Sequence, residues 1–404
     1  MQLGAMLSAA CTSIKRQIRF VTVTTFPAAP GADHPSDDII ALVRELVTRE
    51  SPTRDAVASR SIADLLTGWF EGVGGEVRQE PTAAGTDLVI DVAGAGDPYL
   101  LIGHTDTVWP EGTLDGALPW SQQGDVVRGP GAYDMKAGIV VMLEALRRLQ
   151  PLPRERRRAV RIVLVADEEV GSPESGPLLA ERARGAVAAI GFESPHPDGA
   201  LKVGRRGSAR VRIAVTGRAA HAALDPEHGI SAVDELVDQL MRVREIVADP
   251  ALPGPVLCNV GTISGGARAN VIPARAEAEI GLRFTDPVTE ERVMRALAAL
   301  RPVRAGAEIV VETLSARPAW VASAQDAALV AAIERSAAGI GQRIEARPAA
   351  GAGDTNLLGA LGLPTVDGFG PRGGGAHAED EHFLRSSLGE RIALLRAVLT
   401  LPAE

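Results

Sequence analysis

Apolar residues follow two different rhythms along the first two hundred residues. Runs that are apolar throughout predict buried central strands, at residues 88–90, 99–102 and 160–166. Apolar residues spaced three and four positions apart predict helices, at about residues 36–47, 57–72, 136–149 and 176–185. Strands that alternate with helices in this way are typical of an α/β sheet domain.

The rhythm changes near residue 204. Alternation of apolar and polar residues predicts strands, at about residues 211–215, 256–263, 275–284 and 307–313. Two amphipathic helices are predicted between them, at about residues 229–247 and 287–300. This β-α-β-β-α-β order is the ferredoxin-like signature. Helices return after residue 317, near 325–338, 354–360 and 385–399, so residues 204–316 are predicted to be a domain inserted into an α/β domain formed by 36–203 and 317–404.

Composition narrows the range of functions. The chain has 404 residues and a formal charge of -9, which disfavours a nucleic-acid partner bound through its phosphates. Apolar runs fall short of the roughly 18 residues that a membrane-spanning helix requires. Two cysteines, Cys11 and Cys258, cannot build a disulfide scaffold or a thiolate zinc site. Any metal must therefore be held by carboxylates and by some of the seven histidines.

Residues 1–35 are predicted to be a disordered tail or an over-long start. Their basic residues, Lys15, Arg16 and Arg19, follow an apolar beginning, whereas a secretory signal carries its positive charge before the apolar run. We therefore expect a cytoplasmic protein, with the periplasm as the alternative.

Histidines and acidic residues follow several of the predicted strands. His104 and Asp106 end the strand at 99–103, and two positions apart on extended chain they face the same side. A carboxylate beside a metal-bound imidazole fixes its tautomer. Asp134 lies where the next helix begins, in a position that suits either a helix cap or a carboxylate that bridges two metal ions.

Three more segments contribute further ligands of the same kind. Asp167, Glu168 and Glu169 follow the strand at 160–166, at the edge of the sheet where α/β proteins bind ligands. Consecutive acids at a buried strand end are costly unless they are paired or bound to metal. Glu193 follows another strand-like run, and His377 lies in a glycine-rich loop. Together these residues form a suitable ligand set for two zinc ions about 3.5–4 Å apart with a bridging water.

The set, in this order, resembles the zinc aminoacylase/carboxypeptidase family, which includes bacterial glutamate carboxypeptidase, succinyl-diaminopimelate desuccinylase and acetylornithine deacetylase. The resemblance covers residues 36–400 and is closest to glutamate carboxypeptidase. It implies a mixed sheet of the zinc-peptidase type, flanked by helices, with an inserted α+β lid and dimerisation domain. It also implies the metal sites: His104 with Glu193, Glu169 with His377, and Asp134 bridging both, with cobalt or manganese as substitutes for zinc.

The same resemblance implies roles for the remaining residues. Asp106 orients His104, and Glu168 is the general base and acid. His221 of the inserted domain reaches the active site of a second subunit, which predicts a homodimer. The substrate contacts that it implies are Asn270, Arg283, Arg317 and Gly353, although Gly351-Ala352-Gly353-Asp354 departs from the usual Gly-Gly-Thr-Asp.

The chemistry of these residues indicates hydrolysis of an amide bond N-terminal to a free amino acid. An unligated glutamate beside two zinc ions can move a proton, and an arginine fork fits a free carboxylate. The substrate is then a short peptide or an acylated amino acid, and an N-acyl amino acid deacylase is the alternative activity. A nucleotide-binding protein is disfavoured because Gly94-Ala95-Gly96-Asp97 leads to a strand rather than to a helix. A non-catalytic relative is disfavoured because every ligand and Glu168 are present.

Overall fold

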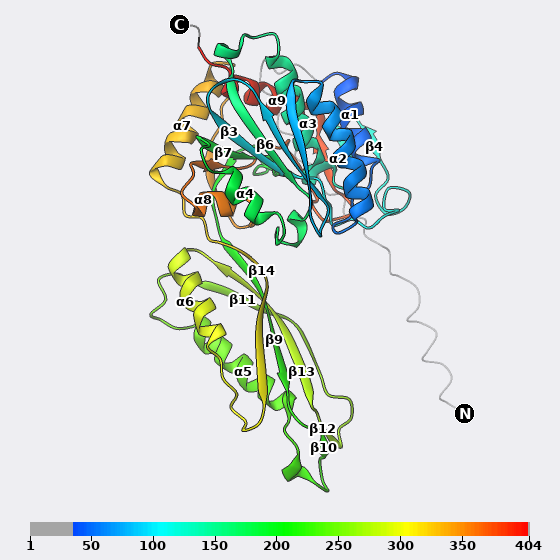
Figure 1. Cartoon of the computed structure of the whole chain (residues 1–404), viewed down its shortest axis with the longest axis vertical. Helices are drawn as coiled ribbons and strands as arrows, with labels where there is room; N and C mark the ends of the chain where they lie inside the picture. The colour runs from blue at the N-terminus through cyan, green and yellow to red at the C-terminus, as the bar shows by residue number, and fades with distance from the viewer. Residues whose placement is uncertain (1–34, 403–404) are drawn as a thin grey trace, which may run out of the picture.

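The chain folds into two lobes. The computed structural model describes residues 35–402, so nearly all of the predicted tail lies outside the described residues. We call residues 207–317 the small lobe and the rest of the described chain the large lobe (Figure 1). Across residues 35–402, each helix is too short or too polar to cross a membrane.

A mixed six-stranded sheet is the centre of the large lobe, and its strand order is β1-β2-β6-β3-β7-β16. The strands are β1 (Gly75–Pro81), β2 (Thr86–Val92), β3 (Ala95–His104), β6 (Arg158–Val165), β7 (Ala188–Gly191) and β16 (Thr365–Val366). β6, β3, β7 and β16 run parallel, whereas β2 is antiparallel to both of its neighbours, β1 and β6. The predicted α/β sheet with its central buried strands is thereby confirmed.

Helices cover both faces of this sheet. Their bounds are α1 (Asp37–Val47), α2 (Ala56–Glu71), α3 (Ala137–Leu149), α4 (Gly176–Arg182), α7 (Ala324–Ala338), α8 (Thr355–Ala360) and α9 (Arg385–Leu399). Alternate residues of a strand point to opposite faces, so Ile162 of β6 packs with α1, α2, α3 and α9, whereas Val163 packs with α4 and α8. Burial on both faces explains why β6 is apolar over most of its length.

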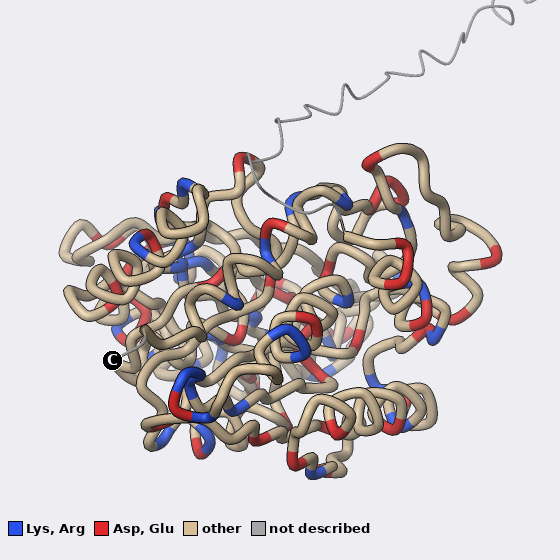
Figure 2. Tube along the Cα trace, turned by 90° about the horizontal axis from the view of Figure 1, so that it is seen from above, with Lys and Arg blue, Asp and Glu red and all other residues tan. Residues whose placement is uncertain are grey.

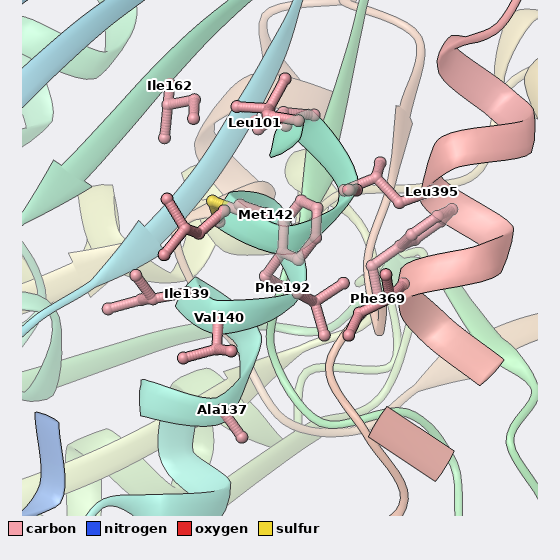
Figure 3. Close-up of a cluster of buried hydrophobic side chains, with 14 of the residues drawn as sticks. Leu101, Ala137, Ile139, Val140, Met142, Ile162, Phe192, Phe369 and Leu395 are labelled. Carbon is pink, nitrogen blue, oxygen red and sulfur yellow. The ribbon is translucent and has the colours of Figure 1, made fainter. Parts of the chain in front are cut away.

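One part of this core supports a predicted metal ligand. Figure 3 shows Leu101 of β3, Ile162 of β6, Met142 of α3 and Leu395 of α9 around Phe192 and Phe369. The rings of Phe192 and Phe369 are 5.8 Å apart between centroids. Phe192 directly precedes Glu193, so the aromatic pair anchors the start of the loop that carries this carboxylate.

The small lobe is an antiparallel sheet with two helices on one face. Its elements are β9 (Gly207–Thr216), β10 (Ala220–His221), α5 (Ala232–Val247), β11 (Val256–Gly265), β12 (Val271–Ile272), β13 (Arg275–Phe284), α6 (Pro287–Ala298) and β14 (Glu308–Arg317). The four long strands have the order β11-β13-β9-β14, which with two crossing helices is the ferredoxin-like arrangement. Alternate residues of β13, such as Ala278, Ile280 and Leu282, are buried against α5 and α6. The predicted α+β insertion is confirmed, while its exact boundaries stay a prediction.

Two neighbouring segments of chain join the lobes. β8 (Leu201–Arg205) pairs with β15 (Ala346–Ala349) in the large lobe and leads directly into β9. Where the chain returns, Trp320 exchanges backbone hydrogen bonds of 2.8 and 3.0 Å with Arg205. The entry and exit of the small lobe are therefore bonded to each other.

A small four-stranded sheet of the large lobe has the strand order β17-β18-β5-β4. Its strands are β4 (Ser121–Gln123), β5 (Val126–Arg128), β17 (Gly373–Gly374) and β18 (His382–Leu384). It attaches the segment around His377 to the rest of the large lobe. Figure 2 shows Lys and Arg interleaved with Asp and Glu, so the excess of acidic residues is spread over many elements.

Candidate metal centre

Several predicted ligands lie at the same edge of the large sheet. His104 is the last residue of β3, Glu168 and Glu169 follow β6, and Glu193 follows β7. These three strands are parallel and adjacent, so their carboxyl ends meet at one edge. The side chains of Asp134 and His377 reach the same place from loops.

Asp134 lies between the two histidines. His104 Nε2 is 3.3 Å from Asp134 Oδ1 and 3.3 Å from Glu193 Oε1. His377 Nε2 is 3.3 Å from Asp134 Oδ2 and 3.2 Å from Glu169 Oε2. Each histidine thus faces one oxygen of Asp134 and one oxygen of a glutamate, which is the pairing implied by the resemblance.

Asp106, two residues after the end of β3, holds the imidazole of His104. His104 Nδ1 is 2.9 Å from the backbone oxygen of Asp106 and 3.4 Å from its carboxylate. The carboxylate of Asp106 also accepts hydrogen bonds from Thr53 Oγ1 (2.8 Å) and from the backbone N–H groups of Glu168 and Glu169. Asp106 therefore links the imidazole of one predicted site to the loop that carries the predicted base.

The backbone at Asp134 differs from a simple helix cap. Residues Ala132–Lys136 form a short irregular turn before α3, and Asp134 has the non-helical angles φ -120° and ψ 92°. The peptide bond from Asp134 to Met135 is cis. This backbone directs the carboxylate to the histidines instead of to the N–H groups of the helix.

Glu168 points into the same cluster without facing His377. It is 8% exposed and lies with His104 and Glu193 in one group of possible ligand atoms. Arg317, the last residue of β14, places Nη2 2.6 Å from Glu168 Oε1 and 3.3 Å from Asp354 Oδ1. Burial raises the pKa of Glu168 well above its usual range, although Arg317 acts in the opposite direction.

The donor set fits two metal ions. Two ligand atoms on one tetrahedral zinc, at about 2.1 Å each, are separated by about 3.4 Å, which is close to the four separations above. Charge-assisted hydrogen bonds are usually shorter than this, at about 2.7–2.9 Å. Glu169 Oε1 is moreover buried without a hydrogen-bond partner. A buried oxygen without a partner is costly, and a metal ion would satisfy it.

Without metal, the histidines hold protons. Burial lowers the pKa of His104, but hydrogen bonds with Asp106, Asp134 and Glu193 raise it well above its ordinary value. Hydrogen bonds with Asp134 and Glu169 raise the pKa of His377 to about 10. Burial raises the pKa of Asp134, but His104 and His377 hold it far below its usual value.

We expect the apparent affinity for zinc to rise steeply with pH. Both raised histidine pKa values mean that these side chains are protonated at pH 7 and must lose their protons to bind metal. Two released protons give a slope of up to about 100-fold per pH unit, which falls as the pH passes the histidine pKa values. Chelator competition between pH 5.5 and 8 measures this slope, and an affinity that does not change with pH would contradict it.

The predicted residues of the small lobe lie elsewhere. His221 and Asn270 are exposed next to each other, on β10 and just before β12, at the end of the small lobe farthest from the large lobe (Figure 1). His221 Nδ1 accepts hydrogen bonds from the backbone N–H groups of Ala223 and Leu224. Arg283 is exposed on β13. Within one chain, the structure does not bring His221 and Asn270 to the cluster.

Gly353 lies on the large lobe beside Arg205. A Cβ atom at Gly353 would come 2.8 Å from Arg205 Nη1, so the guanidinium fills the space of a side chain there. Arg205 forms a buried ion pair with Asp367, which also accepts from Thr355 Oγ1. The departure from Gly-Gly-Thr-Asp thus has a steric explanation.

Sequence reasoning missed two groups near the cluster. Glu381 accepts hydrogen bonds from the loop of Asp134, and Lys202 donates to Ser194, the residue after Glu193, at 3.4 Å. Glu381 is distant in sequence from the loop that it bonds, and Lys202 belongs to no motif. The unusual rarity of lysine was an available hint, because only three of the 42 Lys and Arg residues are lysines: Lys15, Lys136 and Lys202.

Sequence comparisons show clear similarities. The family model described as peptidase family M20/M25/M40 matches residues 100–401. Carboxypeptidase G2 of Pseudomonas sp. (strain RS-16) is 29% identical over 355 residues, covering 86% of this chain and 84% of that protein. A succinyl-diaminopimelate desuccinylase of Caulobacter sp. (strain K31) is 30% identical over 289 residues, covering 66% and 70%.

Solved structures share the fold at lower identity. The aminopeptidase PepT of Bacillus cereus superposes with a TM-score of 0.69 at 21% identity, covering 90% of this chain and 97% of that chain. The YXEP protein of Bacillus subtilis, described as a dinuclear metal binding peptidase, has a TM-score of 0.60 at 18% identity, covering 90% and 97%.

Proposed function

Because the chain belongs to peptidase family M20/M25/M40, we propose that it is a di-zinc carboxypeptidase that cleaves the amide bond before a C-terminal amino acid. The family consists of hydrolases that act on peptide or amide bonds. The observation that carries the proposal is Asp134 between His104 and His377, each of which also faces a glutamate. Carboxypeptidase G2 supports the carboxypeptidase activity by similarity along most of the chain.

The ligands divide into two sets around Asp134. His104 and Glu193 would hold one zinc ion and His377 and Glu169 the other, with Asp134 available to both. A bound zinc pair supplies Lewis acidity that activates water and polarises the scissile carbonyl. Cobalt and manganese accept the same nitrogen and oxygen ligands and are expected to substitute.

Glu168 moves the proton. Its carboxylate belongs to the cluster without occupying a ligand position in the two sets, and it is buried from bulk water. It takes a proton from the attacking water at Oε and delivers it to the nitrogen of the leaving amine. Arg317 keeps the carboxylate directed into the site through Nη2.

Basic side chains fit a substrate that carries carboxylates. Arg317 Nε is buried without a hydrogen-bond partner, and we propose that the substrate's terminal carboxylate satisfies this guanidinium. Lys202 Nζ donates to Ser194, the residue after Glu193, so this amine lies near the centre, where burial and Arg205 lower its pKa. Arg283 and the backbone at Gly353 are the further substrate contacts that we propose.

A second subunit supplies His221 and Asn270. Both are exposed at the end of the small lobe and distant from the metal centre of their own chain (Figure 1). In a two-fold dimer each subunit offers the same residues to its partner, so two sites are completed at once. We propose that the protein is a homodimer and that His221 stabilises the oxyanion across the interface.

The alternative activity is removal of a small acyl group from an amino acid. The similarity to a succinyl-diaminopimelate desuccinylase favours it, and the hydrogen-bond donor of Lys202 suits an acidic acyl group as well as an acidic amino acid. The two activities differ in which side of the amide bond is large.

A substrate panel with zinc restored tests the proposal. It contains N-acyl glutamates, peptides that end in Glu, Ala or Leu, and acetyl- and succinyl-amino acids. Hydrolysis of peptides and bulky N-acyl glutamates supports a carboxypeptidase, whereas turnover of short acyl groups alone supports the deacylase. Zinc-loaded protein that hydrolyses no member of the panel would contradict both.

A further inference from the structure

The carboxylate of Glu381 is completely buried and receives four N–H groups. Its side chain accepts from Trp109 Nε1 (2.6 Å) and the backbone N–H of Gly131 (3.1 Å) through Oε2. Through Oε1 it accepts from the backbone N–H groups of Tyr133 (2.9 Å) and Asp134 (3.1 Å). The residue is 0% exposed. A buried carboxylate is tolerated only when it is well hydrogen-bonded, so losing these donors would leave a costly unsatisfied group.

The four donors belong to segments that carry predicted metal ligands. Gly131, Tyr133 and Asp134 belong to one turn, and the carboxylate of Asp134 faces both histidines. Trp109 follows the strand end that carries His104 and Asp106. Glu381 itself lies four residues after His377 in the glycine-rich loop. One carboxylate therefore connects three ligand-bearing segments that are up to 272 residues apart.

The segment around His377 needs such support. His377 has a φ of 63°, a left-handed conformation that residues other than glycine rarely adopt. The backbone N–H of Glu381 donates to Ala378 at 2.8 Å, and that of Ala378 donates to Gly375 at 2.9 Å, so the loop closes on itself. Its side chain then ties this closed loop to the turn of Asp134. A sparsely populated backbone persists only when its surroundings fix it.

We propose that Glu381 is a positioning residue that fixes the turn of Asp134 relative to the loop of His377, so that the metal positions exist before metal binds. This inference rests on the proposed metal function. It assigns Glu381 a role through the ligands, not through contact with substrate. Preorganised ligands lose less freedom on binding, so the affinity for metal depends on Glu381.

Glu381→Gln tests this role with little change in shape. In either orientation, the amide NH2 of glutamine faces two N–H donors, from Trp109 and Gly131 or from Tyr133 and Asp134. We expect zinc affinity, measured by chelator competition, to fall about 10–100-fold, as for other residues that support metal ligands. Trp109→Phe removes one donor and is expected to lower the affinity less.

The double variant separates positioning from general damage. When Trp109→Phe is added to Glu381→Gln, the amide faces one donor fewer, so zinc affinity is expected to recover in part. Thermal unfolding of the metal-free proteins provides the second readout. If Glu381→Gln lowers the unfolding temperature but leaves zinc affinity within twofold, the residue is merely structural and the proposal is overturned. If Glu381→Gln does not fold, an unchanged zinc affinity in Trp109→Phe overturns it.

Zinc affinity is measured without substrate, so a wrong substrate class leaves the test of Glu381 intact. A wild-type chain that binds no zinc would instead overturn the proposed function.

Discussion

Glu168→Gln is expected to lower kcat about 10²–10⁴-fold while zinc content stays at the wild-type level. Glutamine has nearly the same shape and can still accept from Arg317 Nη2, which is 2.6 Å from Oε1. It cannot take a proton from water at neutral pH. Because Glu168 is outside the two proposed ligand sets, the loss appears in kcat and leaves the metal in place. Single-turnover kinetics and metal analysis of the same preparation measure both effects.

Asp167→Asn is the matched control. Asp167 is the neighbouring acid in the same tripeptide and is 0% exposed, but its carboxylate accepts from the backbone N–H groups of Glu174 and Ser175. It supports the loop rather than the metal cluster, so we expect its kcat to stay within a few-fold of wild type. If Glu168→Gln keeps more than a tenth of the wild-type kcat, the assigned proton transfer is wrong.

Two inactive variants are expected to restore activity to each other. In a heterodimer of His221→Ala with Glu168→Gln, one site has an intact Glu168 and receives an intact His221 from the partner. The other site has neither. A heterodimer purified through two different affinity tags should therefore have about half the activity of wild type, although each parent homodimer is nearly inactive.

The control for this experiment is His228→Ala. His228 is exposed on the same lobe, seven residues from His221, and belongs to no proposed site. The variant should be fully active. A heterodimer as inactive as its parents, or a His221→Ala homodimer with full activity, would exclude a role of His221 in the partner's site.

The strands and helices that pack against one core were predictable because each imposes its own period on the sequence. In β13, for example, every second residue is buried, and in α5 the buried residues recur three to four positions apart. The positions of His104, Glu169 and Glu193 were also predictable, because parallel strands end at one edge of a sheet. A residue at the end of such a strand can therefore be placed without knowing its distant contacts.

The remaining features depend on contacts between distant parts of the chain. β1 was missed because Gly75–Pro81 has little apolar pattern and is held by pairing with β2. Glu381 gave no local signal, since its donors lie about 250 residues earlier. Lys136 likewise gave no local signal, because it is 1% exposed and donates to the backbone oxygen of Arg49, 87 residues earlier in the chain. Only the folded backbone brings these groups together.

Because Arg205 and Trp320 are hydrogen-bonded to each other, the chain of the large lobe is nearly continuous even when the small lobe is left out. The chain departs and comes back at residues whose backbone N and O atoms are 2.8 and 3.0 Å apart. A turn of a few residues could close such a gap, as expected where domain insertions are tolerated. The region between these two residues contributes no strand to the six-stranded sheet. Recombination at this position could therefore delete the small lobe, or exchange it for another domain, and leave that sheet intact.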